Sequence, residues 1–380
     1  MGAETRTFRD LMEEVQKYQF CGKCGGCVSF CSADQLGALG LSSDGTPILV
    51  DEEKCLKCGI CYLICPNIHE LDEELKRKTG WEPPIGAVRD ILSAQTTNPT
   101  VGERCTDGGV VTSLLLYLLD HHMIDGALVS RSDGPFHRAP FLATTGEEII
   151  SASGSHYDES YPLAELATQY STYSPAMYQL KELRKGMVDR VAMVGTPCQI
   201  HTVRKMQVLK ILPADVIKYF FGLFCMENFS FNDLQIEGIR KKYGFEMKDI
   251  IKINVKEDFF AYLKDGRVIH IPFKEIDSIA RPACLVCPDF SAEYSDISFG
   301  GLGSPEGYTT VLIRTDRGNW IYREALAAGY LREKRYPSIQ KARSDWMKLH
   351  TQIINFSEKK RARASKNRAE RRGTVSPPPV

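Results

Sequence analysis

The stretch CGKCGGCVSFC at residues 21–31 is matched by CLKCGICYLIC at residues 55–65. Both place four cysteines in the spacing C-x2-C-x2-C-x3-C, which holds 4Fe-4S clusters in two-cluster ferredoxins. Three thiolates, each separated from the next by two residues, wrap a loop around three corners of a cubane, and the fourth is directed to the other cluster. The doubled spacing therefore predicts a domain with two 4Fe-4S clusters at the front of the chain.

Because ligation is crossed in this arrangement, each cluster takes three cysteines from one stretch and one from the other. We expect Cys21, Cys24, Cys27 and Cys65 to hold one cluster, and Cys55, Cys58, Cys61 and Cys31 to hold the second. Between the two stretches, residues 38–51 predict a short hairpin with a turn at 42–45 and a strand at 47–50.

A disulfide framework and zinc sites are the less favoured uses of these cysteines. Disulfide frameworks suit small secreted domains, whereas this chain has 380 residues, thirteen cysteines and no apolar signal segment. Zinc sites usually take two C-x2-C pairs, and not two runs of four. Because no run approaches 18 apolar residues either, we expect a soluble protein of the reducing cytoplasm, without a transmembrane segment.

The formal net charge of zero hides a basic end. Residues 359–372 carry eight Lys and Arg against one Glu, which leaves 40 basic and 47 acidic residues elsewhere. Such a run is most often a solvated, partly disordered tail. Docking onto a partner subunit, peripheral attachment to an anionic membrane and RNA binding are alternatives, and nucleic acid is the least favoured because no aromatic residue follows Phe356.

The pattern predicts an α+β chain: a two-cluster ferredoxin-like domain followed by a mixed α/β body. The domain covers residues 1–70 and opens with a helix over about 8–18, a charged connector covers 71–98, the body covers 99–335, and a helix and the basic tail cover 336–380. In the body, predicted strands at 126–129, 190–194 and 217–221 alternate with helices at 110–119, 177–184, 200–207 and 232–243. Further strands at 250–255, 259–263, 268–271 and 311–314 indicate mixed or antiparallel additions.

Four further cysteines are dispersed through the body: Cys198, Cys225, Cys284 and Cys287. The first two follow the ends of predicted strands, and the last two form a C-x2-C pair. Loops at the carboxyl ends of neighbouring strands converge in an open α/β sheet, so these cysteines predict a third 4Fe-4S site. A four-thiolate zinc site and buried inert cysteines are the alternatives. Cys105 stands outside every group and is expected to be an ordinary thiol.

Two glycine pairs are candidate cofactor contacts. Gly108 and Gly109 precede a helix that starts Val110-Val111-Thr112, and such a pair exposes N–H groups that suit a phosphate or a flavin edge. Gly300 and Gly301 raise the same possibility. The plainer explanations are a helix capped by Asp107 and an ordinary turn. Neither pair fits the G-x-G-x-x-G dinucleotide pattern, so NAD binding is not predicted.

Four motifs taken in order resemble the family of coenzyme F420 hydrogenase/dehydrogenase beta subunits over about residues 85–330. They are GGVVT at 108–112, VGTPCQ at 194–199, GLFC at 222–225, and CLVCPD at 284–289 with DIS at 296–298. The added front domain resembles the F420H2 dehydrogenase input subunit and some formate dehydrogenase beta subunits. Lys256 matches a basic family segment near the flavin, although Glu257-Asp258 follows where the family pattern has Lys-Gly, and a solvated lysine is the alternative. Residues 151–162 loosely resemble a flavin-side loop.

The resemblance implies an iron–sulfur flavoprotein of methanogenic metabolism that binds FAD and uses coenzyme F420 as its substrate. It also implies that Cys198, Cys225, Cys284 and Cys287 hold the third cluster. A deazaflavin delivers hydride and a cluster accepts one electron at a time, so FAD would convert between them and pass electrons to a redox partner subunit. No catalytic acid or base is expected. A reductase of chlorophyll-type substrates and a pure electron-transfer subunit are the two other functions considered.

Overall fold

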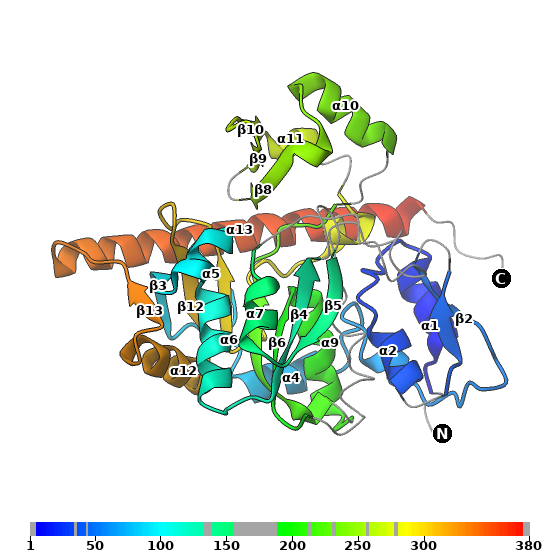
Figure 1. The fold of residues 1–380 in the computed structure, drawn as a ribbon. Coiled ribbons are helices and arrows are strands. Elements are labelled where there is room, and N and C mark those ends of the chain that lie inside the picture. The colour runs from blue at the N-terminus through cyan, green and yellow to red at the C-terminus, as the bar shows by residue number, and fades with distance from the viewer. Residues whose placement is uncertain are drawn as a thin grey trace.

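The computed structural model describes residues 5–33, 36–42, 45–132, 138–154, 188–211, 214–229, 233–255, 258–276 and 280–374. The front of the chain is a small unit of short helices and one hairpin (Figure 1). Its elements are α1 (Phe8–Leu11), which continues as the π-helical turn η1 (Met12–Gln16), then α2 (Gly26–Ala33), β1 (Leu39–Leu41), β2 (Pro47–Leu49) and α3 (Ile60–Leu63). The hairpin pairs Leu39 with Leu49 in antiparallel register, which confirms the predicted hairpin; the opening helix ends at Gln16, slightly before the predicted end.

The body is built on an eight-stranded sheet with the order β13-β3-β12-β11-β7-β6-β4-β5. The strands are β3 (Asp90–Thr96), β4 (Gly126–Ser132), β5 (Arg138–Ala143), β6 (Val191–Gly195), β7 (Ile217–Leu223), β11 (Ile297–Gly300), β12 (Thr309–Ile313) and β13 (Leu331–Glu333). The central strands β4, β6, β7 and β11 are parallel, and the outer pairings are antiparallel. The predicted mixed sheet is thus confirmed, whereas β3, β5, β11 and β13 were not predicted.

Helices cover both faces of this sheet. Successive residues of a strand point to opposite sides, and the central strands carry apolar residues on both sides, so both faces need a covering layer. Phe221 packs in the core beneath α6 (Val110–Asp120), α7 (Gly146–Ser151) and α12 (Asp316–Ala327), while its neighbour Phe220 packs beneath α9 (Pro197–Val208). The short helix α5 (Pro99–Arg104) adds Val101 to the first core, and α4 (Asp72–Thr79) adds Leu75 to the second. Both faces of the central strands are buried, as parallel strands require.

A separate three-stranded antiparallel sheet follows β7 in sequence. It contains β8 (Ile250–Val255), β9 (Phe259–Leu263) and β10 (Val268–Ile271), with α10 (Asp233–Tyr243) and α11 (Phe273–Ile276) beside it (Figure 1). The three strands lie where they were predicted. The 3-10 turns η4 (Ala214–Val216), η5 (Met247–Asp249) and η7 (Pro282–Val286) complete this part of the chain. The helix predicted over 177–184 lies outside the described residues.

The structure differs from two predicted segment boundaries. The connector predicted over 71–98 contains α4 and β3, and β3 lies inside the large sheet, so the body begins before residue 99. The solvated tail predicted for residues 359–372 is wrong, because these residues belong to α13 (Ile339–Thr374), a helix of 36 residues. Figure 1 shows α13 running along the body from the β13 side to the front unit. Of the helices in the described part of the chain, none combines the length and apolar character that a membrane span needs.

Candidate redox site

The eight front cysteines lie in two groups that follow the predicted crossed pattern. Burial and then the charges of Cys24, Cys21 and Cys65, with a smaller contribution from Cys61, raise the pKa of Cys27 well above its ordinary value. Burial and then the charges of Cys58 and Cys55, with a further contribution from Cys31, raise the pKa of Cys61 to about 12. Because this repulsion weakens with distance, it indicates which thiols lie near one another. We name Cys21, Cys24, Cys27 and Cys65 group 1, and Cys55, Cys58, Cys61 and Cys31 group 2.

The four dispersed cysteines also come together, and we name them group 3. Cys198 lies in the first turn of α9, and Cys225 follows β7. Cys284 lies within the turn η7, and Cys287 directly follows it. Burial raises the pKa of Cys225, and the charges of Cys284, Cys287 and Cys198 add to the shift. The main-chain N–H of Asn228 donates to Cys284 Sγ at 3.4 Å, and its side-chain amide donates to Cys225 Sγ at 3.5 Å. The sheet edge therefore gathers these thiols as the strand-end argument predicted.

The donor sets of the three groups fit 4Fe-4S clusters in composition, because each consists of four cysteines. Among the described residues, no three His, Cys, Asp or Glu side chains are arranged to hold a single metal ion. A cubane differs from such a site because its four thiolates bind four different irons. Cys105 belongs to none of the three groups, and its thiol donates to the main-chain carbonyl of Asp107 at 2.9 Å.

Group 1 lies between group 3 and group 2. The hydroxyl of Thr202 lies 3.6 Å from Cys24 Sγ in group 1 and donates to the carbonyl of Cys198 in group 3 at 2.9 Å. Val286, inside the C-x2-C loop of group 3, is fully buried in the core of the front unit. Cys58 of group 2 is exposed. The three groups therefore run in the order 3, 1, 2 from the body toward the surface.

The first glycine pair packs tightly against the sheet. A Cβ atom on Gly108 would lie 2.5 Å from both the carbonyl oxygen of Ala94 and the amide nitrogen of Thr309. Gly109 is the N-cap of α6 with a φ of 69°, and no side chain caps this helix, so the predicted capping role of Asp107 is wrong. Val110 and Thr112 are buried in the body. Gly108 is therefore needed for the close packing of this loop against β3 and β12.

The second glycine pair meets the first through Asp107. A Cβ atom on Gly301 would lie 2.7 Å from the Asp107 carboxylate, which also accepts a hydrogen bond from Asn254 Nδ2 at 3.1 Å. A Cβ atom on Gly300 would lie 2.4 Å from the Phe224 ring, and Phe224 directly precedes Cys225 of group 3. The structure thus brings the two glycine motifs together beside group 3. Lys256 and residues 155–162 of the predicted flavin-side loop lie outside the described residues.

Basic residues of α13 cover group 3, which the sequence interpretation missed. Lys360 is 1% exposed, and its ammonium group donates to the main-chain carbonyls of Cys225 and Asp289. Burial lowers the pKa of Lys360, but the charges of Cys287, Cys225 and Cys284 outweigh it and leave the pKa raised. Arg363 forms an ion pair of 2.6 Å with buried Glu227, close to Cys225 in sequence. The helix therefore places positive charge directly beside the four thiols.

Arg368 of α13 joins the front unit to the body. Its Nε donates to the carbonyl of Val286 at 2.7 Å, and its Nη2 donates to Asn67 Oδ1 at 2.6 Å. Burial lowers the pKa of Arg368, while the charges of Cys287 in group 3 and Cys65 in group 1 oppose that shift. One guanidinium group thus lies close to both cysteine groups.

Comparison with known proteins places most of the chain in one family. Residues 91–167 and 188–338 match the N-terminal and C-terminal parts of the coenzyme F420 hydrogenase/dehydrogenase beta subunit, and residues 48–67 match a 4Fe-4S binding domain. The coenzyme F420 hydrogenase subunit beta of Methanothermobacter thermautotrophicus is 33% identical over 301 residues, covering 78% of this chain and 99% of that protein. A second relative, from the F420H2 dehydrogenase of Methanosarcina mazei, is 27% identical over 317 residues, covering 80% of this chain and 82% of that protein.

A solved structure shares the fold. A chain of the F420-reducing NiFe hydrogenase complex from Methanosarcina barkeri matches with a TM-score of 0.65 and 29% sequence identity, over 78% of this chain and 96% of that chain. The family match ends at residue 338, immediately before α13 begins at Ile339. The helix that covers group 3 therefore lies beyond the matched family region.

Proposed function

Because the chain belongs to the family of coenzyme F420 hydrogenase/dehydrogenase beta subunits, we propose that it exchanges a hydride between coenzyme F420 and a bound FAD. The electrons then pass singly through three 4Fe-4S clusters to or from a partner subunit. Its relatives are subunits of an F420 hydrogenase and an F420H2 dehydrogenase, which supports an oxidoreductase that works within a larger complex.

The order of the cysteine groups is the observation that carries this proposal. Group 3 lies beside the glycine motifs, group 1 contacts group 3 through Thr202, and group 2 reaches the surface at Cys58. A bound flavin supplies the conversion between a two-electron hydride and single electrons. The chain itself holds the four thiols of group 3 beside the proposed flavin position. It holds the eight thiols of groups 1 and 2 between group 3 and the surface. This arrangement supports an electron path that begins in the body and ends at group 2.

The glycine motifs support the FAD position. Gly108 and Gly301 allow their two loops to pack closely together through Asp107, which brings both glycine motifs beside group 3. The Phe224 ring lies against Gly300, and Phe224 directly precedes Cys225. A flavin bound beside Gly300 would therefore lie close to group 3. Lys256 stays a predicted flavin contact. The partner is a redox subunit of a complex, which would hold this chain in the cytoplasm or at the membrane face.

Metal and flavin content test the cofactor assignment. Anaerobically purified protein is expected to contain about twelve irons, an equal amount of sulfide and one FAD per chain, from three four-iron clusters and one flavin site. Cys198→Ala should remove about four irons and leave the front clusters in place. Cys105→Ala, which alters a thiol outside the groups, is the matched control and should leave the iron content unchanged. Equal iron contents in the two variants would exclude Cys198 as a cluster ligand.

Addition of reduced F420 tests the substrate. We expect anaerobic reduced F420 to bleach the flavin absorbance first and the cluster absorbance next, in the wild-type protein. No response from protein that contains FAD would contradict F420 as the substrate and favour a reductase of another organic compound. Protein without flavin but with its clusters would be an electron-transfer subunit.

A further inference from the structure

A cavity of about 400 Å³ lies between the glycine loop 301–305 and the first half of α13. Its size falls within the range of pockets that bind small molecules and cofactors. Gly301 and Gly303 line one side, and Leu349 and Gln352 of α13 line the other. Half of the cavity therefore belongs to the matched family region, and half to a helix beyond it.

The lining is strongly basic. Lys334, Lys341 and Lys348 face one aspartate, Asp345, which gives a formal charge of +2. Asp345 pairs with Lys334 at 2.6 Å and with Lys341 at 2.8 Å. Within the described part of the chain, Lys348 has no acidic partner. The excess of positive charge favours an anionic ligand.

The wall of the cavity also contains a hydrogen-bond acceptor that is not satisfied by any described residue. Gln352 Oε1 is buried and lacks a partner among the described residues. A Cβ atom on Gly303 would lie 2.4 Å from this oxygen, so the loop approaches the helix as closely as a glycine permits. Ser93 and Ser304, by contrast, bond to each other at 2.7 Å. A ligand hydroxyl or N–H group would satisfy the Gln352 oxygen.

The cavity adjoins the redox site. Gly301 lines the cavity and also lies against Asp107, which joins the two glycine motifs. Along α13, Gln352 lies in the cavity wall and Lys360 lies beneath group 3. A ligand held in the cavity would therefore extend toward the proposed flavin position.

We infer that this cavity binds the phosphate-bearing part of a redox coenzyme. FAD carries a diphosphate and coenzyme F420 carries a phosphate diester, and both have ribityl hydroxyls that could donate to Gln352. The lysines would hold the phosphate by charge-assisted hydrogen bonds. The identity of the coenzyme rests on the proposed function, whereas the presence of a phosphate site does not.

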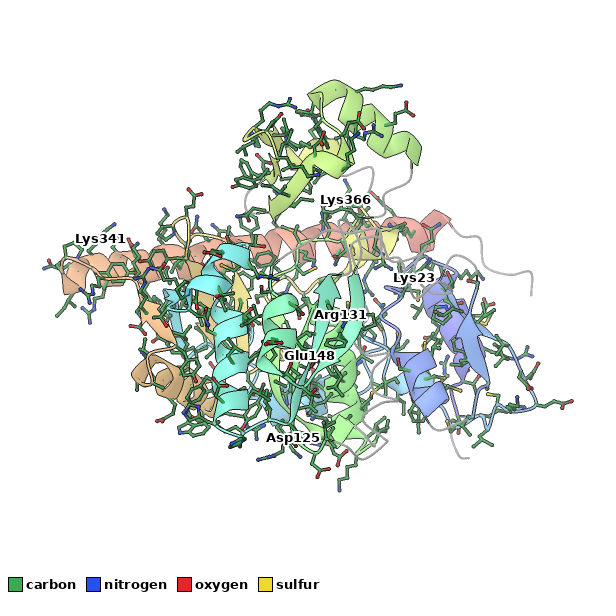
Figure 2. All side chains as sticks on the ribbon, in the orientation of Figure 1. Lys23, Asp125, Arg131, Glu148, Lys341 and Lys366 are labelled. Carbon is green, nitrogen blue, oxygen red and sulfur yellow. The ribbon has the colours of Figure 1, made fainter. Side chains whose placement is uncertain are left out.

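The test compares the wild-type protein with Lys341→Gln/Lys348→Gln. Lys366→Gln is the matched control, because Lys366 is an exposed lysine at the other end of the same helix (Figure 2). Three properties are measured on the purified full-length proteins: FAD per chain, the dissociation constant of F420, and calorimetric binding of inorganic pyrophosphate. We expect the double variant to lose about tenfold in affinity for at least one of these phosphates, and the control to match the wild type.

The pattern of losses identifies the source of the phosphate. Lower FAD content with unchanged F420 affinity assigns the cavity to FAD, and weaker F420 binding with unchanged FAD content assigns it to F420. If the wild-type protein neither contains FAD nor binds F420, the proposed function fails. The phosphate site is then tested by pyrophosphate alone. Pyrophosphate binding to the wild-type protein that is lost in the double variant would support the site. No difference between the double variant and the wild type in all three properties overturns the inference.

Discussion

Lys360 donates a hydrogen bond from its buried ammonium group to the main-chain carbonyl of Cys225. A buried lysine is costly unless it is paired, and this one is held by two carbonyl groups and by the field of three cysteines. The positive charge belongs to α13, and the thiols belong to three separate segments of the body. The helix therefore contributes to the electrostatics of group 3 without supplying a ligand.

Lys360→Met should lower the reduction potential of the cluster proposed for group 3. Reduction adds one negative charge, which Lys360 stabilises, and a unit charge about 8 Å away at an effective dielectric constant of about 20 is worth on the order of 2 kcal/mol, or ~90 mV for one electron. Potentiometric titration followed by electron paramagnetic resonance would measure the change. Lys359→Met, at the exposed neighbouring position, should leave all potentials unchanged. Equal potentials in the two variants would show that Lys360 has only a packing role.

Arg368→Gln should loosen the front unit from the body. The change removes hydrogen bonds to Val286 and Asn67 and leaves buried acceptors unpaired, which costs about 1–3 kcal/mol. We expect faster amide hydrogen exchange in residues 282–287 and 65–68, measured by mass spectrometry. Lys366→Gln, two residues earlier and exposed, is the control. Unchanged exchange at these two segments would argue against a joining role for Arg368.

Leu56→Glu should slow electron exchange with the partner subunit. Leu56 is 69% exposed and lies in group 2 between Cys55 and the exposed Cys58, where an apolar contact with a partner would be buried. We expect roughly a tenfold lower rate with the partner complex and an unchanged rate with a small dye acceptor. Val268→Glu changes a residue that is 51% exposed on β10 and should affect neither rate. Equal effects of the two variants on the rate with the partner complex would show that the partner does not bind at Leu56.

Glu293 should make stability fall as the pH rises. Burial, together with the charge of Asp289, raises its pKa from 4.5 to about 7, although Arg361 and Trp81 oppose the shift. The folded state then holds a proton that the unfolded state releases, so the contribution of Glu293 to the free energy of unfolding should decrease between pH 4.5 and about 7, by about 3 kcal/mol. Anaerobic denaturant titrations at several pH values would measure the slope. Glu293→Gln should flatten it, whereas the exposed Glu306→Gln should not.

The grouping of the front cysteines was predictable because the spacing is local. Two residues between thiols allow a short loop to surround one cluster, and this requires no knowledge of the remaining fold. The neighbour relation between groups 1 and 3 was not predictable, because it depends on the contact of Cys24 with Thr202, 178 positions away. Gly108 and Gly301 were identified separately for the same reason. Their junction at Asp107 appears only when the sheet brings β3, β11 and β12 together.

The basic end of the chain misled the sequence interpretation because its buried residues are partly polar. Leu349, Ile353, Ser357, Lys360 and Ala364 are all buried, and they recur every three or four residues along one face of α13. An apolar periodicity search misses this face, because Ser357 and Lys360 interrupt it. The partners of Lys360 are the main-chain carbonyl groups of Cys225 and Asp289, which carry no sequence signature. The helix is indicated by the spacing of its buried positions and not by the chemical nature of their side chains.

The position of α13 in the chain has a consequence for how the protein matures. All twelve cysteines of the three groups precede Ile339, so they leave the ribosome before the helix that covers Cys225 exists. Because a chain folds progressively from its N-terminal side during synthesis, group 3 is open to iron delivery while α13 is being made. Docking of Lys360 and Arg368 would then close the loaded site. We therefore expect an assembly intermediate with its iron installed and its covering helix still undocked.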